Sequence, residues 1–348
     1  MEIDNLQLLK SALFNISIED NSAKKLEIGQ NDDFVSYCKG ILKELISTTR
    51  NKSFKFRDVN ELVPSHVIAL SKEQSDWEVR TRSIAEKLLS VEIAAQEKIE
   101  KLNKKIQKGS LLILLVSIDD EIKFVISKIE HAGFLDESEI KLKKGLPEKT
   151  RLQKSCLIFM DDDSNVSNIL ISDSGDSIRE YWWNSFLSAQ ELISSELNTS
   201  NAFIAIDRLL QTNIKKTSPA DYWFMRNDVI SYFRNNESFA FNDLVDKISS
   251  HTFENEELSK NKDNFIRKLN ALPSAERQGF DTQFKLAPGV IKAKFKKTII
   301  LGDNFELKIN GEISDFSNKI KADVDTVGKY IKIYSDIGYK EFSGKSND

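Results

Sequence analysis

The chain has 348 residues, of which 40% are hydrophobic and 30% charged, which excludes a wholly disordered protein and allows two domains. Its formal net charge of −4 excludes an overall positive field, so contacts with nucleic acid would need local basic surfaces. Two cysteines exclude a disulfide framework, and the longest apolar run is far shorter than the roughly 20 residues that span a bilayer. We therefore expect a cytoplasmic protein without a membrane anchor.

Residues 1–175 are predicted to form an N-terminal α+β domain. Apolar residues recur at spacings of three and four through Phe34–Arg50, which indicates an amphipathic helix. Cys38 lies beside its apolar stripe, so we expect a small buried side chain there rather than a reactive thiol. Phe54–Phe56 alternates as a short strand does, whereas periodicity does not decide between strand and helix for Leu6–Ile18.

A long helix is predicted over residues 80–108. Its apolar residues recur every three or four positions from Ile84 to Ile106, and Gly109 follows as the expected helix terminator. The lysines between them are mixed with glutamates, which indicates a solvated face with ion pairs between residues four apart. Phosphate contacts and a coiled-coil seam are the alternatives for this face.

Two β-hairpins are expected after this helix. Ser110–Ile118 and Ile122–Ile129 are rich in β-formers and flank the acidic turn Asp119–Glu121. The first of these runs is apolar on both faces, which predicts a central strand. Cys156–Met160 and Ile169–Ser172 form the second expected hairpin.

The acidic triplet Asp161–Asp163 lies in the turn of the second hairpin and is the one concentration of carboxylates, with Asp173 and Asp176 nearby. Consecutive aspartates point in alternate directions, and the glycine and glutamate of a calcium-binding loop are missing. We therefore expect a turn, with no metal, no cofactor and no catalytic residues. The alternative is a Mg²⁺-dependent hydrolase acting on nucleic acid.

A turn cluster at Ser172–Asp176 marks the expected boundary to a second domain over residues 176–348. This domain is predicted to be helical and to end in a β-hairpin at residues 290–340. Trp182 and Phe186 can share a helical face, and we expect them to pack in a core rather than stack on bases. Further helices are expected over Asn201–Gln211, Asp221–Phe233, Phe239–Ile248 and Asn255–Leu269. The fold class is thus α+β, with mixed or antiparallel hairpins and packed helices in two lobes.

The segment Ile291–Lys297 is the first candidate for contacts with DNA. On a strand, Lys292, Lys294 and Lys296 would project from one face at spacings of about 6–7 Å, and Lys297 would point the other way. Such a row of ammonium groups could follow a phosphate backbone. The alternative is a charged edge strand that protects the sheet from aggregation.

The segment Ile140–Lys154 is the second candidate. A proline and a glycine predict a loop or an interrupted strand, and a basic loop can hold phosphates without reading sequence. A solubilising loop is the alternative. The basic residues proposed to contact DNA here are Lys141, Lys143, Lys144, Arg151 and Lys154.

Several segments carry a resemblance to a known family. SIAEKLLSVE at Ser83–Glu92 precedes GSLLILLV at Gly109–Val116, and IREYWWNSFLSAQEL follows at Ile178–Leu192. An aromatic constellation comprises Tyr232, Phe233, Phe239 and Phe241. The C-terminal pattern comprises Ile300, Leu301, Asn304, Phe305, Leu307, Ile309 and Gly311, followed by Gly328, Tyr330, Lys332 and Tyr334.

In the order of these segments the chain resembles the bacterial nucleoid-associated proteins of the NdpA/YejK-like group. The resemblance implies a non-enzymatic protein of the nucleoid that binds double-stranded DNA with little sequence preference. It supplies no catalytic residues and no cofactor. The alternative function is a protein-interaction component of a bacterial defence or chromosome-maintenance complex, which would bind a protein partner or a second copy through an exposed face of the long helix.

Overall fold

The computed structural model describes residues 6–28, 32–47, 51–103, 105–136, 141–146, 152–161, 163–175, 177–253, 255–302 and 304–343. It confirms the α+β class, with one large antiparallel sheet, small hairpin sheets and packed helices. The first of two compact units comprises Met1–Ser195, Ser238–Asn242 and Asp281–Lys285. The second comprises Glu196–Glu237, Asp243–Phe280 and Leu286–Asp348. The boundary expected at residue 175 therefore falls inside the first unit.

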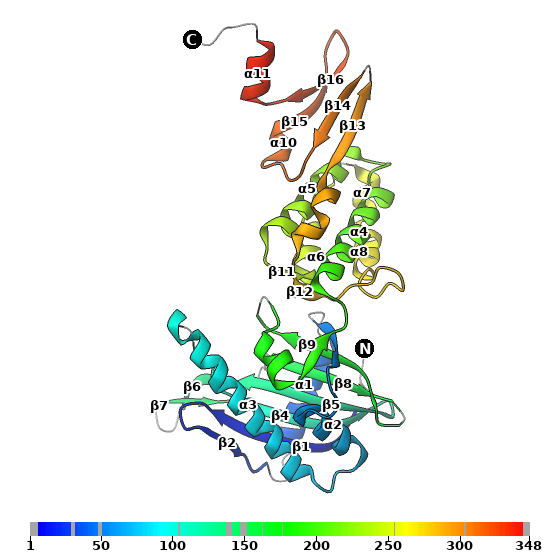
Figure 1. Cartoon of the computed structure of the whole chain (residues 1–348). Coiled ribbons are helices and arrows are strands. Elements are labelled where there is room, and N and C mark those ends of the chain that lie inside the picture. The colour runs from blue at the N-terminus through cyan, green and yellow to red at the C-terminus, as the bar shows by residue number, and fades with distance from the viewer. Residues whose placement is uncertain are drawn as a thin grey trace. The chain divides into compact units, whose positions relative to one another are not determined.

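The first unit is built on an eight-stranded antiparallel sheet in the order β10-β3-β9-β8-β5-β4-β1-β2 (Figure 1). Its strands are β1 (Leu6–Ser17), β2 (Ser22–Lys25), β3 (Lys52–Phe56), β4 (Gly109–Ile118), β5 (Glu121–Glu130), β8 (Leu152–Met160), β9 (Val166–Asp173) and β10 (Ala189–Glu191). Two further two-stranded sheets pair β6 (Ala132–Asp136) with β7 (Lys141–Gly145), and β11 (Ser238–Ala240) with the sequence-distant β12 (Gln283–Lys285). Leu6–Ile18, which periodicity left undecided, is thus mostly strand.

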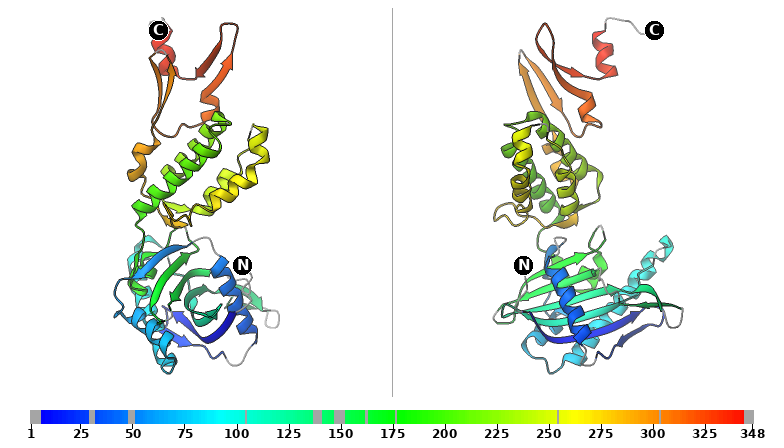
Figure 2. Two further views of the ribbon diagram at one scale, coloured as in Figure 1. Left: turned by 90° about the vertical axis from the view of Figure 1, so that its right-hand side faces the viewer. Right: turned by 180° about the vertical axis from the view of Figure 1, so that it is seen from behind.

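Helices cover both faces of the large sheet, because β4 is apolar on both. Its odd-numbered residues from Leu111 to Leu115 pack in one core with α2 (Leu62–Lys72) and α3 (Trp77–Ile99). Its even-numbered residues from Leu112 to Ile118 pack in the other core with α1 (Asp32–Ser47). Figure 2 shows α1 crossing one face of the sheet in its right-hand view. The predicted central position of this strand is confirmed.

The turn between β4 and β5 follows from its aspartates. Asp119 and Asp120 have φ angles of 51° and 65°, and Ile118 pairs directly with Glu121. Two consecutive left-handed residues are typical of the tight turn whose twist matches antiparallel strands. Aspartate tolerates that conformation better than most residues do. The first predicted hairpin is therefore confirmed, as is the second, which pairs β8 with β9.

The long helix is shorter than predicted. α3 ends at Ile99, a 3₁₀ turn η1 follows over Glu100–Leu102, and Asn103 takes the left-handed capping conformation with φ 53°. Gly109 opens β4 instead of ending the helix. A Cβ atom there would lie 2.4 Å from the carbonyl oxygen of Ile129, so close strand approach explains this glycine.

The aromatic segment after β9 is a short π-helical element, η2 (Tyr181–Phe186), which leads into edge strand β10. A longer helical face is therefore not formed. Trp182 and Phe186 are buried in the core that contains α3, with ring centroids 4.9 Å apart. The prediction that these two rings pack rather than stack on bases is confirmed by their burial.

Helices dominate the first part of the second unit, and small hairpins dominate its last part. The helices are α4 (Ser195–Asn213), α5 (Pro219–Asn235), α6 (Phe241–Ser249), α7 (Glu256–Lys260), α8 (Lys262–Asn270), the 3₁₀ helix η3 (Pro288–Ile291), α9 (Lys292–Phe295), α10 (Phe316–Lys319) and α11 (Asp336–Phe342). The strands are β13 (Lys297–Gly302) with β14 (Phe305–Ile309), and β15 (Ile320–Val324) with β16 (Lys329–Ile333).

Two sequence-based expectations for this unit need correction. The single terminal hairpin expected at residues 290–340 is two hairpins, each a separate sheet. The single helix expected over Asn255–Leu269 is divided at Asn261 into α7 and α8. Within the described ranges, no helix combines the length and the apolar content that crossing a bilayer requires.

Candidate functional site

The lysine-rich segment before β13 is held to the core by apolar side chains of η3 and α9. Ile291 and Phe295 are buried, and the Phe295 ring lies 5.3 Å from that of Phe203 on α4. Lys292, Lys294 and Lys296 are exposed. The charged side chains of the segment are therefore exposed to solvent, while the burial of Ile291 and Phe295 fixes its backbone.

The predicted strand geometry for these lysines is wrong, because Lys292–Phe295 is a helical turn and β13 begins only at Lys297. Ile291 and Phe295 are four residues apart, which suits the buried side of a helix. Pro288 also favours a helical start, since its fixed φ suits the first turn. Residues two apart on a helical turn project to opposite sides, and Lys296 follows the turn in extended backbone, so the lysines do not form the single row that a strand would give.

A buried arginine on α5 fixes the end of α9. Arg226 is 1% exposed, and its Nε donates to Oδ1 of Asp207 at 2.9 Å. Its Nη2 donates to the carbonyl oxygen of Lys294 at 2.8 Å, and its Nη1 to that of Phe295 at 3.2 Å. A cation at the carboxyl end of a helix satisfies carbonyls that have no partner within it. Arg226 thus holds the backbone in the middle of the lysine-rich segment.

Asp207 on α4 is the anion at the centre of this network. Its Oδ2 accepts a hydrogen bond from Gln211 at 2.7 Å and lies 3.8 Å from Nζ of Lys297. Burial and the charge of Asp207 together raise the pKa of Tyr222 to about 12, so the hydroxyl keeps its proton and donates to Oδ1 at 3.5 Å. Lys297 is half-buried beside this carboxylate. Lys297 therefore belongs, with Asp207 and Arg226, to a buried polar network that we call the anchor. The other three predicted lysines form the exposed surface.

The second predicted basic segment is partly a strand. Lys141, Lys143 and Lys144 lie on β7, whose backbone pairs with β6, so of the two expectations, a loop or an interrupted strand, the strand holds for them. Arg151 lies outside the described residues. The structure does not bring this segment together with α9 in one unit.

Lys154 is not available for phosphates. It lies on β8, is 8% exposed, and its Nζ is 3.2 Å from Oδ2 of Asp173. The same Nζ lies 5.8 Å from the ring centroid of Tyr181. Buried lysines need an anionic partner because desolvation penalises the charge. A neighbouring pair follows the same rule: Lys128 contacts Glu92, and burial lowers the pKa of the lysine and raises that of the glutamate.

The acidic triplet serves the β8–β9 turn. Oδ1 of Asp161 accepts hydrogen bonds from the backbone N–H groups of Asp163 at 3.1 Å and Asn165 at 2.8 Å. Asp162 and Asp176 lie outside the described residues, and Asp173 is paired with Lys154. Among the residues that the structure describes, no three histidine, cysteine or acidic side chains converge as a metal site would require. The turn prediction is confirmed for Asp161.

Sequence reasoning missed the two residues that position the lysines. Asp207 follows Phe203 by four residues and precedes Leu210 by three, so it falls on the apolar face of α4. Arg226 falls in the same way on the apolar face of α5, between Tyr222 and Val229. A charge on each buried stripe is a signal that the two helices share an ion pair.

Comparison with known proteins identifies no matching family model and no matching curated sequence. The functional proposal therefore depends on the geometry of the site. In the second unit, the exposed lysines of α9 and Lys296 lie on a backbone that the buried Arg226–Asp207 pair holds in place.

Arg226→Met should destabilise the second unit, because Asp207 stays buried without its main cation and two carbonyls lose their donor. We expect the free energy of unfolding to fall by about 3–5 kcal/mol and trypsin to cleave faster at the α9 lysines. Urea titration and mass-spectrometric mapping of the earliest tryptic fragments measure the two effects. Arg226→Lys keeps the charge but loses the planar guanidinium group. Its free energy of unfolding should therefore lie between those of the wild type and Arg226→Met.

Arg208→Met is the matched control for this measurement. Arg208 is an exposed arginine on α4, next to Asp207 in sequence. Its removal should change the free energy of unfolding by less than about 0.5 kcal/mol. Equal losses for the two variants would contradict the anchoring role of Arg226.

Proposed function

We propose that this chain is a non-enzymatic protein that binds double-stranded DNA with little sequence preference through Lys292, Lys294 and Lys296. The observation that supports the proposal is the exposure of these three lysines on a turn fixed by Arg226. Lysine ammonium groups are compact charges on flexible stems, which suits phosphates at varying positions. Contacts of this kind position a protein on DNA and carry no sequence information.

The local charge supports the same function. Between Pro288 and Gly302 the sequence has four lysines and no acidic residue, although the whole chain carries a net charge of −4. The buried carboxylate of Asp207 neutralises part of the charge of Lys297, whereas the other three lysines are exposed to solvent. The segment is therefore a local basic patch on a protein whose net charge is negative. In keeping with the resemblance, we infer that the protein acts at the bacterial nucleoid, in chromosome maintenance or in defence.

Replacing all three lysines by glutamate should abolish binding to a random-sequence duplex in a gel-shift titration. Replacing them by glutamine should reduce the slope of log affinity against log salt by roughly 0.9 for each phosphate that the protein no longer neutralises. Lys98, Lys101 and Lys105 near the end of the long helix provide a control with the same change in charge. If the control triple loses binding and the α9 triple keeps it, the proposal is wrong.

A second candidate function is association with protein, and the C-terminal hairpins favour it. Ile300, Phe305 and Val327 are 79%, 70% and 96% exposed, and the apolar residues of α11 are also uncovered. The two hairpins and the start of α5 border a groove of about 720 Å³ with apolar sides. Apolar surface of this extent on a folded protein marks an interaction site. Ile84 and Leu88 of the long helix are buried in the core, so that part of the helix offers less apolar surface than the hairpins do.

A second copy of the chain is the partner that these hairpins fit, since exposed strand edges pair readily with identical edges. We expect twice the monomer mass in light scattering after size exclusion, and monomers after Ile300→Glu with Phe305→Glu. Val79→Glu, at a 68% exposed position on α3, is the control. A wild-type protein that stays monomeric at micromolar concentration would exclude self-association. Treatment with nuclease before the measurement separates association through protein from association through DNA.

A further inference from the structure

The last segment of the second unit, residues 297–343 from β13 to α11, has almost no core of its own. Of the residues that the structure describes in it, Ile309 alone is buried. A two-stranded hairpin is marginally stable at best in water, and so is a helix of fewer than about 12 residues. The segment consists of two such hairpins and the short helices α10 and α11. Its elements therefore need a further contact that buries their apolar side chains.

Both hairpins of this segment line the groove of about 720 Å³ that also borders the start of α5 (Figure 1). Residues two apart on a strand share a face, and one face each of β14 and β15 contributes apolar side chains to the lining: Leu307, Ile309, Ile320 and Ala322. The rings of Phe224 on α5 and Phe316 on α10 also line it, edge to face at 5.6 Å between centroids. A groove of this kind suits the apolar side of a helix.

The terminal helix α11 is such a helix, and its apolar side chains have no cover within the chain. Oγ of Ser335 accepts a hydrogen bond from the backbone N–H of Gly338 at 3.0 Å, which caps its amino end. Ile337 and Phe342 are 78% and 93% exposed. Asp336 and Lys340 are four residues apart and share the opposite, polar side. α11 is therefore an amphipathic helix without a partner surface.

The groove and α11 belong to the same segment, which favours a second copy of the chain as the partner. Of the described residues that line the groove, none belongs to α11. Each copy therefore has one open groove and one uncovered helix, and exchange between two copies satisfies both in a closed two-fold dimer. The segment contains seven lysines and eight acidic residues, so its net charge does not drive two copies apart.

The charge beside the groove also favours α11. Lys321 borders the groove and lies directly opposite Lys332 in the register of β15 and β16. Like charges at directly opposed positions of two strands are destabilising. α11 carries Asp336 and Glu341, and a carboxylate placed near Lys321 would offset this repulsion.

We propose that α11 of each copy docks in the groove of a second copy, so that two chains exchange their C-terminal helices. Ile337 and Phe342 enter the groove, and an acidic residue of α11 approaches Lys321. The inference rests on the second candidate function, self-association, and assigns its contact surface. It does not use the lysines of α9, so it is independent of DNA binding.

Disulfide trapping between two variants of the full-length chain tests the exchange. Ser343→Cys places a thiol at the end of α11, and Ser317→Cys or Ala322→Cys places one in the groove. The native Cys38 and Cys156 are buried and do not interfere. After mixing and oxidation, Ser343→Cys should form a covalent dimer with at least one of the two groove variants, as measured on a non-reducing gel.

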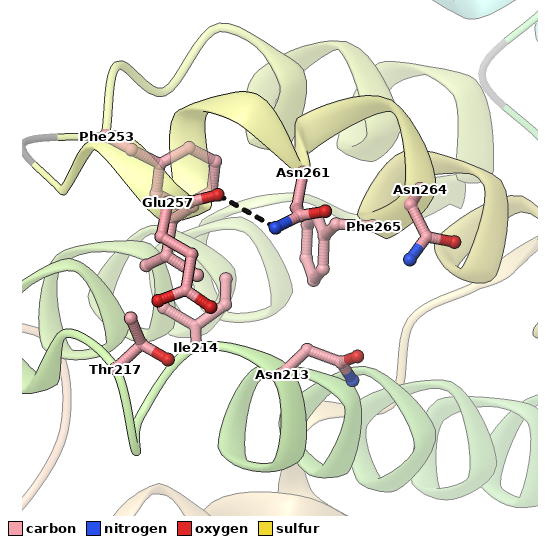
Figure 3. Close-up of a pocket in the computed structure, with 9 residues that line it drawn as sticks. Asn213, Ile214, Thr217, Phe253, Glu257, Asn261, Asn264 and Phe265 are labelled. Carbon is pink, nitrogen blue, oxygen red and sulfur yellow. Dashed lines mark hydrogen bonds between the residues drawn. The ribbon is translucent and has the colours of Figure 1, made fainter.

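Asn264→Cys is the matched control for the groove variants. Asn264 is an exposed residue of the same unit that lines a different cavity, of about 260 Å³, between the end of α4 and the α7–α8 pair (Figure 3). Its mixture with Ser343→Cys should give only the background yield of dimer. Combining Ser343→Cys and Ser317→Cys in one chain distinguishes exchange, which gives a covalent dimer, from docking of α11 in its own groove, which gives a bridged monomer.

Ile337→Glu with Phe342→Glu should weaken self-association by about a hundredfold in analytical ultracentrifugation, because two apolar contacts of the groove are lost. Both side chains are exposed in the single chain, so its folding should not change. Lys340→Glu changes the net charge equally on the polar side of α11 and should have little effect.

The outcomes separate this inference from the function on which it rests. A wild-type chain that stays monomeric at micromolar concentration contradicts self-association itself. If the chain forms a dimer, the helix exchange is overturned when neither groove cysteine is trapped, when the bridge forms within one chain, or when Ile337→Glu with Phe342→Glu behaves like Lys340→Glu. Self-association would then stand and use another surface.

Discussion

The buried ion pair between Arg226 and Asp207 is the interaction on which the basic segment of the second unit depends. Burying two charges costs free energy that their attraction offsets only when further hydrogen bonds satisfy the remaining polar atoms. Gln211 donates a further hydrogen bond to the carboxylate of Asp207, and the carbonyls of Lys294 and Phe295 accept hydrogen bonds from the guanidinium of Arg226. Because those acceptors belong to the backbone of α9, the requirement for satisfied charge also fixes where the lysines emerge.

Lysines in the two units show that surroundings decide the role of a charge. Lys128 and Lys154 are buried, and each has an acidic partner within the core of the first unit. The lysines of α9 lie in a stretch without acidic residues, above a floor of apolar side chains. Only the three-dimensional contacts distinguish a lysine that completes a core from one that can meet a phosphate.

Local signals made much of the first unit predictable. The apolar runs of β4 and β5 and the aspartates between them specify a hairpin within a few residues, so sequence alone sufficed. The sequence did not predict the burial of Lys154, because its partner Asp173 lies on the neighbouring strand. It also misassigned α9, where alternating lysines imitate a strand and the deciding contacts come from α4 and α5, far away in sequence. The sequence thus indicated the exposed lysines of the candidate site, but not the buried Arg226 and Asp207 that hold them in place.

The most direct test of the DNA-binding account is lysine acetylation footprinting with and without duplex DNA. Each reactive lysine is quantified by mass spectrometry at low salt, where phosphate contacts are strongest. The account predicts that DNA protects Lys292, Lys294 and Lys296 and leaves the exposed Lys98 and Lys101 of the first unit unchanged. Equal reactivity of the three α9 lysines in the presence and absence of bound DNA would contradict it.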